Sequence, residues 1–517
     1  MARRLTTFSK FLITLLIVAA IAFAGRYILN ETEFGRNLVN KSEQDDDYEK
    51  KEDSKVDDSV IKIGVVTWGG YAGGQYFNEG FQANSQSRFY KDYGFRVEFK
   101  ILDDFDASRA AWKSDEVNLL WATIDAFPTE SAGLRDFEPQ VVFQADWSRG
   151  GDAIVVRRGI TKVSDLKGLK IAVAEMTPSH SFLLWLLNAG GLDIKDVEIV
   201  PQPNAIDAAQ VFKSGQVDAA VVWSPDDEDC INTVSGSRVL ESTRSASHII
   251  ADVFIAKKEY VERNQEKLRQ LYEGWMRGAA EINASDDNKR KAAKILADAF
   301  EGFDENMSYN AINNVRLCTH GDNMDFFKLN PNYKGVTGER LYSNMTNVYQ
   351  SLGFADNDVP NWRLVANSKL VSSTNSLTGE QHASEGQKVF TTATESEKTK
   401  TAIATKRVSI NFRTGEFQLS ENAKTIIDLE FVDIAKSFAN SRIRIEGNTD
   451  NVGSASSNKR LSLKRAQSVA DYLVQEHGMP ANRFIVVGNG PDKPVASNNT
   501  AEGKAKNRRT DFELVPE

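Results

Sequence analysis

Apolar and polar positions alternate along the chain in a way that predicts an α/β unit near its start. Apolar side chains run almost without a break over residues 61–66 and predict a buried strand. Two more strands are expected at 97–101 and 117–121, with a helix at 106–112 between them. Strands that alternate with helices at this spacing favour a parallel sheet covered on both faces.

The same alternation begins again after residue 150 and predicts a second unit of the same kind. Strands are expected at 153–156, 197–200 and 217–223, and helices at 182–187 and 208–215. The chain then returns to the first unit through an apolar stretch at 249–255, before a helical region. Such a return makes the connection between the units a hinge that can close on a ligand. We therefore predict one two-lobed α/β domain over 59–370.

A smaller unit is predicted over residues 408–517. An alternating strand at 408–412 precedes an amphipathic helix at 420–439, whose apolar stripe consists of Ala423, Ile427, Phe431, Ile434 and Phe438. A strand, a second helix and two more strands are expected at 443–447, 462–476, 484–488 and 510–514. This order, β-α-β-α-β-β, predicts a small α+β sandwich.

The amino-terminal 30 residues read as an export segment. Arg3, Arg4 and Lys10 precede an apolar run at 11–25, and a basic start before such a run stays in the cytoplasm. Two interpretations are open: cleavage after Ala24 as a signal peptide, or a retained anchor over 11–29 that spans roughly 28 Å. We favour the retained anchor. Under both, the rest of the chain lies outside the cytoplasm.

Two stretches are predicted to be linkers. Residues 31–58 are rich in charged side chains without apolar periodicity, so they form a solvated tether. Residues 371–407 are rich in Ser, Thr, Lys and Glu, and we expect a flexible Ser/Thr-rich linker between domains.

The composition of the chain argues against several classes of function. A net charge of −9 and a pI near 5.4 argue against general nucleic-acid binding, which needs a basic face. Five histidines without paired spacing make a metal site unexpected. The two cysteines, Cys230 and Cys318, could form one bridge in an exported protein or remain as two buried thiols.

Candidate ligand-binding residues follow the predicted strands, because ligands of open sheets sit beyond the carboxyl ends of strands. Trp68, Gly69, Tyr71 and Asp125 occupy such positions, and Trp223 ends a later strand. Trp68, Tyr71 and Trp223 could flank a small planar or apolar body, with Ser148 and Arg149 as anion donors.

A helix start in the second unit is the predicted anion site. Thr177 is a plausible N-cap before Pro178, so the backbone N–H groups of Ser179, His180 and Ser181 would point at the ligand. The positive end of the helix favours a phosphate, sulfonate or carboxylate. The alternative remains open, because Thr-Pro-Ser also begins many ordinary helices.

The blocks Ser164-Asp165-Leu166-Lys167-Gly168 and Gly215-Gln216-Val217-Asp218-Ala219 give the central domain a family resemblance. It resembles the NMT1-like solute-binding proteins of nitrate, sulfonate, taurine and thiamine-precursor transporters. The resemblance implies a type 2 periplasmic binding protein fold, a small solute and an ABC permease as partner. Relatives that make the thiamine pyrimidine use pyridoxal phosphate and a sacrificial histidine. The sequence has no segment that supports such chemistry, so we expect a binding protein without cofactor rather than an enzyme.

The carboxyl-terminal motif is Gly447-Asn448-Thr449-Asp450-Asn451-Val452-Gly453, followed by Asn458 and by Leu461-Ser462-Leu463-Lys464-Arg465-Ala466. It places one carboxylate on a Gly-bounded turn and one guanidinium on the next helix. Opposite charges fixed a few ångströms apart can complement a zwitterion. The competing interpretation is a structural salt bridge between Asp450 and Arg465.

These blocks, with Gly488-Asn489-Gly490 and Asn507-Arg508-Arg509, resemble the OmpA-like peptidoglycan-binding domain. The resemblance implies that Asp450 and Arg465 grip diaminopimelate of the cell-wall stem peptide, and it makes Thr449, Asn458 and Leu461 candidates beside them. Asn448 departs from the His or Tyr that the family often has there. Arg508 and Arg509 are expected to support the fold or the wall surface.

The leading hypothesis is a non-catalytic protein of a Gram-negative-type periplasm, held to the inner membrane and attached to the wall, that binds a small anionic solute. The runner-up is an envelope scaffold whose binding-protein domain contacts a protein partner. An ion-driven stator subunit needs an acid within the membrane, and residues 11–25 contain none. An enzyme of thiamine-precursor synthesis ranks third.

Overall fold

The computed structural model describes residues 60–410, 412–413 and 415–515. The export segment predicted at 1–30 and the tether predicted at 31–58 lie outside these residues. Within the described part of the chain, no helix combines the length and the apolar character that crossing a bilayer requires.

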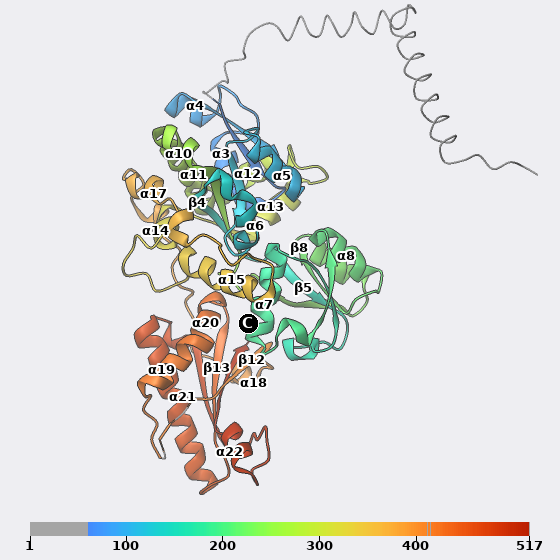
Figure 1. The fold of residues 1–517 in the computed structure, drawn as a ribbon, viewed down its shortest axis with the longest axis vertical. Helices are drawn as coiled ribbons and strands as arrows, with labels where there is room; N and C mark the ends of the chain where they lie inside the picture. The colour runs from blue at the N-terminus through green and yellow to red at the C-terminus, as the bar shows by residue number, and fades with distance from the viewer. Residues whose placement is uncertain (1–59, 411, 414, 516–517) are drawn as a thin grey trace, which may run out of the picture. The chain divides into compact units, whose positions relative to one another are not determined.

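The first lobe, in which Figure 1 labels β4, is built on a six-stranded mixed sheet with the order β11-β4-β10-β3-β1-β2. Its strands are β1 (Val60–Val65), β2 (Arg96–Ile101), β3 (Leu119–Thr123), β4 (Pro139–Ser148), β10 (Ala251–Lys257) and β11 (Val315–Leu317). β1 pairs in parallel with β2 and β3, whereas β10 runs antiparallel to β3 and β4. The parallel pairing predicted from the first three strands is therefore confirmed, and the sheet is mixed because β10 brings the chain back from the second lobe antiparallel to its neighbours.

Helices cover both faces of this sheet. They are η1 (Gly69–Tyr71), α3 (Ala72–Phe77), α4 (Arg88–Tyr93), α5 (Phe105–Lys113), α6 (Phe127–Leu134), η2 (Arg135–Phe137), α10 (Lys258–Arg263), α11 (Gln265–Ala284), α12 (Asp286–Ala297), α13 (Glu305–Asn313), α14 (His320–Phe326), α15 (Gly338–Leu352), α16 (Trp362–Val365) and α17 (Lys369–Ser373). Trp275 of α11 is fully buried against Phe254 and Phe143 of the sheet, with ring centroids 4.8 and 5.2 Å away. This aromatic cluster is the centre of the first core.

The second lobe has a five-stranded sheet with the order β7-β6-β8-β5-β9. Its strands are β5 (Asp152–Val156), β6 (Lys170–Ala174), β7 (Glu198–Gln202), β8 (Ala219–Trp223) and β9 (Arg238–Ser242). Its helices are η3 (Val163–Leu166), α7 (Pro178–Ala189), η4 (Ile194–Asp196), α8 (Ala205–Lys213) and α9 (Asp226–Thr233). β6 lies parallel to β7 and β8, and β5 is antiparallel to β8 and β9. The expected two-lobed α/β architecture is confirmed.

The chain crosses between the lobes twice, at 149–151 and at 243–250. The two crossings are bound to each other and to the first lobe: Gly150 donates its N–H to Thr243 Oγ1 (2.8 Å), and Arg149 donates its N–H to Asn314 O (2.8 Å). Gly150 has φ +123° at this point, a conformation that favours glycine. The paired crossings agree with the predicted hinge.

The carboxyl-terminal domain has a four-stranded sheet with the order β12-β15-β13-β14. Its strands are β12 (Ala404–Val408), β13 (Arg442–Asn448), β14 (Phe484–Gly490) and β15 (Thr510–Val515). Its helices are α19 (Glu421–Ile427), the π-helical turn η6 (Asp428–Val432), α20 (Asp433–Ser437), α21 (Ala455–His477), η7 (Ala481–Arg483) and α22 (Ala501–Asn507). All five residues of the predicted apolar stripe are buried, so the predicted α+β sandwich is confirmed.

Three details of this domain differ from the prediction. The first strand is β12, four residues earlier than expected, because Ala404 to Val408 pair with Leu514 to Thr510. α21 begins at Ala455 rather than near 462, because Ser454 caps it by accepting the N–H of Ser457 (3.2 Å). α22 separates the last two strands, which were expected to follow each other directly.

The stretch at 371–407 is packed, and the expectation of a flexible coil there is wrong. Besides the start of β12 it contains η5 (Glu380–His382) and α18 (Glu395–Thr399). Phe390 is 5% exposed, and Ala383 O accepts a hydrogen bond from Thr319 Oγ1 (2.7 Å). Glu385 donates its N–H to Asp322 Oδ1 (2.6 Å). Tertiary contacts fix this segment despite its polar composition.

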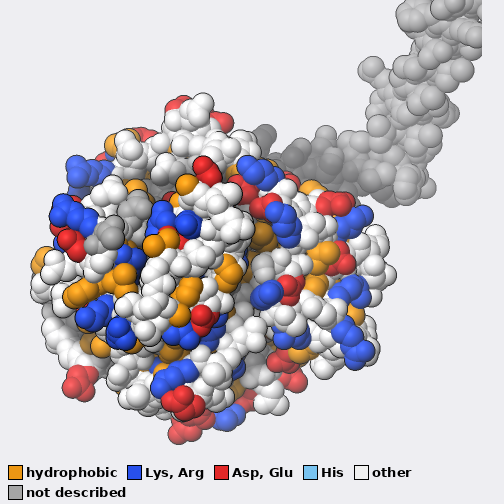
Figure 2. Space-filling model, turned by 90° about the horizontal axis from the view of Figure 1, so that it is seen from below, with side chains coloured by type: hydrophobic (Ala, Val, Ile, Leu, Met, Phe, Trp, Pro, Cys, Tyr) orange, Lys and Arg blue, Asp and Glu red, His pale blue; other side chains and the backbone are white. Residues whose placement is uncertain are grey.

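Both cysteines are free buried thiols, Cys230 on α9 and Cys318 just after β11, so the disulfide alternative is not realised. The surface shown in Figure 2 intermingles basic and acidic side chains, with hydrophobic ones between them. That face therefore has no extended basic area, in line with the overall acidic charge.

Candidate functional site

Strand ends from both lobes bring polar side chains together where the lobes meet. Asp146 near the end of β4 and Asp252 near the start of β10 are directly opposite each other in the antiparallel register. Trp68 Nε1 donates a hydrogen bond to Asp146 Oδ2 (3.2 Å), and Tyr71 Oη donates one to Asp252 Oδ2 (2.6 Å). The two aromatic residues predicted after β1 therefore each hold a carboxyl group.

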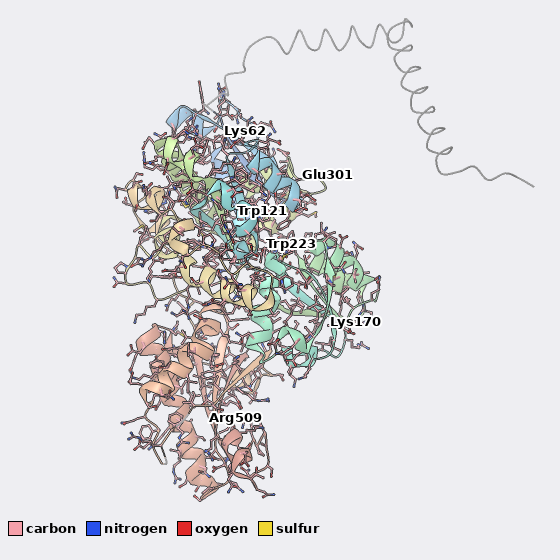
Figure 3. All side chains as sticks on the ribbon, viewed as in Figure 1. Lys62, Trp121, Lys170, Trp223, Glu301 and Arg509 are labelled. Carbon is pink, nitrogen blue, oxygen red and sulfur yellow. The ribbon has the colours of Figure 1, made fainter. Side chains whose placement is uncertain are left out.

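The hinge side adds a third carboxyl group. Asp152 begins β5, directly opposite Trp223 of β8, and the indole of Trp223 stabilises its ionised form. Ser148 Oγ donates to Asp152 Oδ2 (2.7 Å) and shares a hydrogen bond with Thr243 Oγ1 (2.8 Å). Figure 3 labels Trp223 at the carboxyl end of its strand. Ser148 and Trp223 thus bind the carboxyl group of Asp152, rather than the anionic ligand expected from the sequence.

The fourth carboxyl group is Asp125, which follows β3. Its Oδ1 accepts the N–H of Ala251 (3.4 Å), and the Ser181 hydroxyl from the second lobe also interacts with it. Ser181 Oγ is in turn 2.8 Å from Tyr349 Oη of α15. We call Asp125, Asp146, Asp152 and Asp252 the interlobe acidic site.

Burial makes all four groups reluctant to ionise. It raises the pKa of Asp125 to about 8 and the pKa values of Asp152 and Asp252 to about 7. Burial and the neighbouring charge of Asp252 raise the pKa of Asp146 well above its ordinary value. The side chains of the four are between 0% and 4% exposed.

The start of α7 differs from the predicted anion site. Thr177 does not cap the helix with its side chain, because Thr177 Oγ1 donates to Ala174 O (2.7 Å). The N–H groups of His180 and Ser181 both donate to Thr177 O (3.0 and 3.2 Å), so neither is free for a ligand. Ser179 is fully buried.

His180 and Arg149 are not available as positive charges either. His180 Nδ1 accepts the N–H of Met176 (3.2 Å), and burial lowers the His180 pKa to about 4. Arg149 Nη2 pairs with Glu385 Oε2 (2.5 Å) and lies 3.4 Å from His248 Nε2. The expectation that these groups surround an anion is not supported.

Close backbone approaches explain the glycines of this region. A Cβ on Gly69 would lie 2.4 Å from Ala311 O of α13, so Gly69 packs against that helix rather than toward the acidic site. A Cβ on Gly70 would lie 1.6 Å from Asp146 Oδ2, and one on Gly151 would lie 2.1 Å from the Trp68 ring. Gly70 and Gly151 thus let the backbone lie directly against Asp146 and Trp68.

Sequence reasoning named Asp125 but missed the other three carboxyl groups. Asp146 interrupts the apolar run before Trp147, and Asp252 interrupts the run between Ala251 and Val253. An acidic residue inside a buried strand is a signal of function, because buried carboxylates are rare without partners.

The carboxyl-terminal motif forms a second candidate site. Asp450 follows β13 in a loop held by two bonds: Thr449 donates its N–H to Gly490 O (2.9 Å), and Asn458 Nδ2 donates to Val452 O (3.0 Å). Thr449 Oγ1 also donates to Asp450 O (2.8 Å). Thr449 and Asn458 are therefore supports of the loop, and Leu461 is half-buried on α21.

Asp450 pairs with Arg508. Its Oδ2 accepts from Arg508 Nη1 (2.7 Å), and its Oδ1 accepts the N–H of Val452 (3.1 Å). Burial opposes ionisation of Asp450, but these two hydrogen bonds outweigh it and hold its pKa below the usual range. The side chain of Arg508 is about half exposed. The sequence assigned Arg508 to support of the fold or of the wall surface, whereas the structure pairs it with Asp450.

Arg465 points to the same place from α21. Its Nε donates to Glu416 O (3.0 Å), its Nη2 donates to Arg413 O (3.2 Å), and its guanidinium lies 4.7 Å from the Phe412 ring centroid. Arg465 and Arg508 both line a cavity of about 40 Å³, with Ile410, Phe412, Gly447, Asn448, Arg509 and Thr510. In the described part of the chain, Arg465 makes no ion pair with Asp450. The competing interpretation of the motif, a structural salt bridge between these two residues, is therefore not observed.

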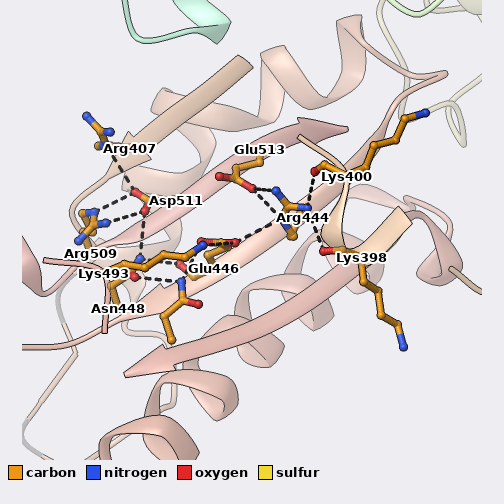
Figure 4. A network of polar contacts seen from close by, with 11 residues as sticks. Lys398, Lys400, Arg407, Arg444, Glu446, Asn448, Lys493, Arg509, Asp511 and Glu513 are labelled. Carbon is orange, nitrogen blue, oxygen red and sulfur yellow. Dashed lines mark hydrogen bonds and ion pairs between the residues drawn. The ribbon is translucent and has the colours of Figure 1, made fainter. Parts of the chain in front are cut away.

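A buried polar network stands behind this loop on the sheet (Figure 4). Asn448 Nδ2 donates to Asp511 Oδ2 (3.1 Å), which also accepts from Arg509 Nη2 (2.9 Å). Glu446 accepts from Lys493 Nζ (2.7 Å), and Arg444 Nε donates to Glu513 (2.6 Å). Asn448, the departure from the family pattern, therefore anchors β13, and Arg509 supports the fold as expected.

Comparison with known families places both parts of the chain. Residues 411–508 match the OmpA family and residues 139–297 match the NMT1-like family. The chain therefore carries an OmpA domain and an NMT1-like binding-protein domain, as the two resemblances predicted.

Curated relatives match short stretches of the chain. The chain is 37% identical over 111 residues to outer membrane porin F of Pseudomonas aeruginosa, covering 22% of this chain and 31% of that protein. It is 43% identical over 83 residues to the probable lipoprotein YiaD of Escherichia coli, covering 16% and 37%. It is 47% identical over 80 residues to the peptidoglycan-binding protein ArfA of Mycobacterium tuberculosis, covering 16% and 24%. The chain spans less than two fifths of the length of each.

Solved structures align with about three fifths of the chain. The periplasmic aliphatic sulphonate binding protein SsuA from Escherichia coli aligns with TM-score 0.47 and 18% identity, over 59% of this chain and 97% of that chain. The alkanesulfonate-binding protein SsuA from Xanthomonas axonopodis pv. citri aligns with TM-score 0.45 and 14% identity, over 60% and 99%. The desulfurization enzyme DSZB aligns with TM-score 0.41 and 15% identity, over 60% and 97%.

Proposed function

We propose that this chain is a non-catalytic cell-envelope protein that binds a small solute between its two lobes and is moored to peptidoglycan by its carboxyl-terminal domain. The observation that carries the second half is the arrangement of Asp450, Arg465 and Arg508 around one small cavity in an OmpA-family domain. The first half is supported by the NMT1-like match and by two lobes joined through paired crossings.

The chemistry of the wall site suits diaminopimelate. The free end of this residue carries an ammonium and a carboxylate. Asp450 is held ionised by its hydrogen bonds and can accept the ammonium. Arg465 and the half-exposed Arg508 can bind the carboxylate. In this arrangement Arg508 is shared between Asp450 and the ligand.

Cell-wall pelleting with the full chain tests the mooring. Asp450→Ala and Arg465→Ala are each expected to weaken binding to purified peptidoglycan by 10-fold or more, because each removes one charge that faces the zwitterion. Arg460→Ala is the matched control: this arginine lies on the same helix, is exposed, and among the described residues donates one long hydrogen bond, to Ser457 Oγ at 3.4 Å.

Circular dichroism of each variant shows whether the domain remains folded. Wall binding that survives in a folded Asp450→Ala or Arg465→Ala protein would refute the mooring.

A screen of the full chain against small solutes tests the first half. All eight tryptophans lie between residues 68 and 362, so tryptophan fluorescence reports on the lobes alone. A bound solute is expected to raise the midpoint of the fluorescence-detected thermal transition. If no amine, organic acid, sulfonate or sugar raises it, the lobes are not a solute receptor, and the scaffold function replaces this proposal.

The proposed location is the periplasm of a Gram-negative-type envelope. It follows from the match to OmpA-family proteins and from the export segment predicted at 1–30. Anchoring in the inner membrane through 11–29, and an ABC permease as partner, remain predictions of the sequence. Neither the site nor the match to binding proteins calls for a catalytic role.

A further inference from the structure

The interlobe acidic site concentrates negative charge in a buried place. Asp146 and Asp252 are directly opposite on neighbouring strands, where Cβ atoms lie about 4.5–5.5 Å apart and like charges are destabilising. The charge of Asp252 acts on Asp125 and Asp146, and the charge of Asp152 acts on Asp146 and Asp252. The four groups therefore behave as one unit.

Protein cations do not neutralise this unit. Among the described residues, the charge of Arg149 acts on Asp146, and the charge of Arg109 acts on Tyr71, which binds Asp252. Arg149 is paired with Glu385. Arg109 forms a two-bond pair with Glu130 (2.5 and 2.8 Å). The site thus keeps a net negative character wherever its carboxyl groups are ionised.

Several oxygens of the site lack partners. Asp125 Oδ2, Asp146 Oδ1 and Asp152 Oδ1 accept no hydrogen bond from any described residue, although their side chains are 98–100% buried. A buried acceptor without a donor costs free energy, about 1–3 kcal/mol and more when it is charged. Three such atoms in one place indicate donors that a ligand supplies.

Aromatic residues border the same oxygens. Trp68 and Tyr71 bind Asp146 and Asp252 from the first lobe, and Trp223 faces Asp152 from the second. Trp68 contacts Asp146 through its indole N–H edge, and the apolar rings beside the carboxyl groups can pack against the carbon skeleton of a ligand. A carboxylate cluster with tryptophans on two sides complements a positive charge on an organic body.

We infer that the interlobe acidic site binds an organic ammonium cation. An ammonium donates N–H groups in several directions and can satisfy more than one of the free oxygens. A metal ion fits less well, because in the described part of the chain no group of three or more His, Cys, Asp or Glu side chains is arranged to hold one. This inference rests on the proposed solute-binding function and replaces the anion expected from the sequence.

Calorimetric titration of the full chain at pH 8 tests the inference, with ethanolamine, 1,4-diaminobutane and choline as cations and ethanesulfonate as the matched anion. At least one of the three amines is expected to bind, and ethanesulfonate is not. Asp146→Asn and Asp252→Asn are each expected to weaken amine binding 10-fold or more. Asp287→Asn, an exposed carboxylate on α12, is the control and leaves binding unchanged.

Thermal stability without ligand separates a binding role from a structural one. Asparagine keeps an oxygen for the Trp68 N–H, and the substitution removes a charge that repels Asp252. The midpoint of Asp146→Asn is therefore expected to match or exceed that of the wild type. A lower midpoint would assign the site a structural role and overturn the inference.

The two proposals fail in different ways. Binding of ethanesulfonate or of a neutral solute, with none of the three amines bound, overturns the ammonium inference and leaves the solute-receptor function standing. A lack of binding by every solute of the screen removes both.

Discussion

A single buried carboxyl group shows how the fold changes the chemistry of a residue. Asp125 has no exposed surface and faces Asp252, Ser181 and Tyr349. Burial raises its pKa to about 8, far above the ordinary value of about 3.9. At neutral pH the folded protein therefore holds a proton on Asp125 that the unfolded chain has released.

The stability of the lobes should depend on pH accordingly. Between about pH 4 and 8 the folded state binds more protons than the unfolded state at Asp125, so its contribution falls as pH rises and is fully lost above the folded pKa. For each pH unit over which the unfolded state has released this proton and the folded state still holds it, the free energy of unfolding falls by about 1.4 kcal/mol. We expect a lower fluorescence-detected midpoint at pH 8 than at pH 6.5, and a smaller difference in Asp125→Asn.

The comparison of unfolding midpoints starts at pH 6.5 because the buried histidines affect stability below this pH. Burial lowers the pKa values of His180 and His248, which makes the lobes more stable as pH rises toward about 6.5. This trend opposes that of Asp125 and ends where the measurement begins. A pH profile that Asp125→Asn leaves unchanged would show that this carboxyl is not protonated in the folded state.

At the scale of elements, the second candidate site depends on how closely β13 approaches α21. A Cβ on Gly447 would lie 2.2 Å from Ser462 O, and one on Gly488 would lie 2.6 Å from Leu463 N. These glycines let the helix that carries Arg465 rest directly on the strands that end beside Asp450. The motif glycine is thus a packing requirement as much as a turn residue.

Gly447→Ala should therefore push α21 away from the sheet. Overpacking of this kind typically costs about 1–3 kcal/mol. Hydrogen exchange of the peptide covering 442–448 in the full chain should become faster by roughly 5- to 100-fold. Gly386→Ala is the control, because a Cβ there meets nothing within 4 Å and its backbone needs no positive φ. Equal exchange in both variants would contradict the close approach.

At the scale of the whole molecule, the stretch at 371–407 is packed against its neighbours rather than forming a flexible linker between the domains. Phe390 is the hydrophobic anchor: the guanidinium of Arg442 lies 5.5 Å from its ring centroid, and that of Arg483 lies 6.0 Å away. His248 donates its N–H to Ser437 O (3.0 Å), so a crossing between the lobes also contacts the carboxyl-terminal domain.

Limited proteolysis can measure this packing. Trypsin is expected to cleave slowly after Lys388 in the wild type, because the segment must first leave its contacts. Phe390→Ala should accelerate this cleavage at least 5-fold. Val389→Ala is the neighbouring control, since Val389 is 88% exposed. Rapid cleavage after Lys388 in the wild type would restore the flexible linker that the composition predicted.

The sequence alone determined most strands and helices of the lobes and of the carboxyl-terminal domain, but not α22 or the elements within 371–407. Period-2 and period-3.6 patterns placed both α/β lobes and the helix stripe through Phe431, because a half-buried element must repeat its apolar side chains at its own period. The motif around Asp450 and Arg465 could also be recognised from the sequence, because its residues lie close together along the chain. Boundaries failed where pairing or capping decided them, as at β12 and at Ser454.

Only the tertiary structure decided what the sites contain. Asp146 and Asp252 are 106 positions apart and meet because β10 returns beside β4. Arg508 reaches Asp450 across 58 positions. Whether Thr177 faces an anion or turns back on Ala174 depends on local packing that no periodicity records. The negative charge of the interlobe acidic site comes from strands that are far apart in the sequence. Its total therefore becomes visible only when the fold brings these strands together.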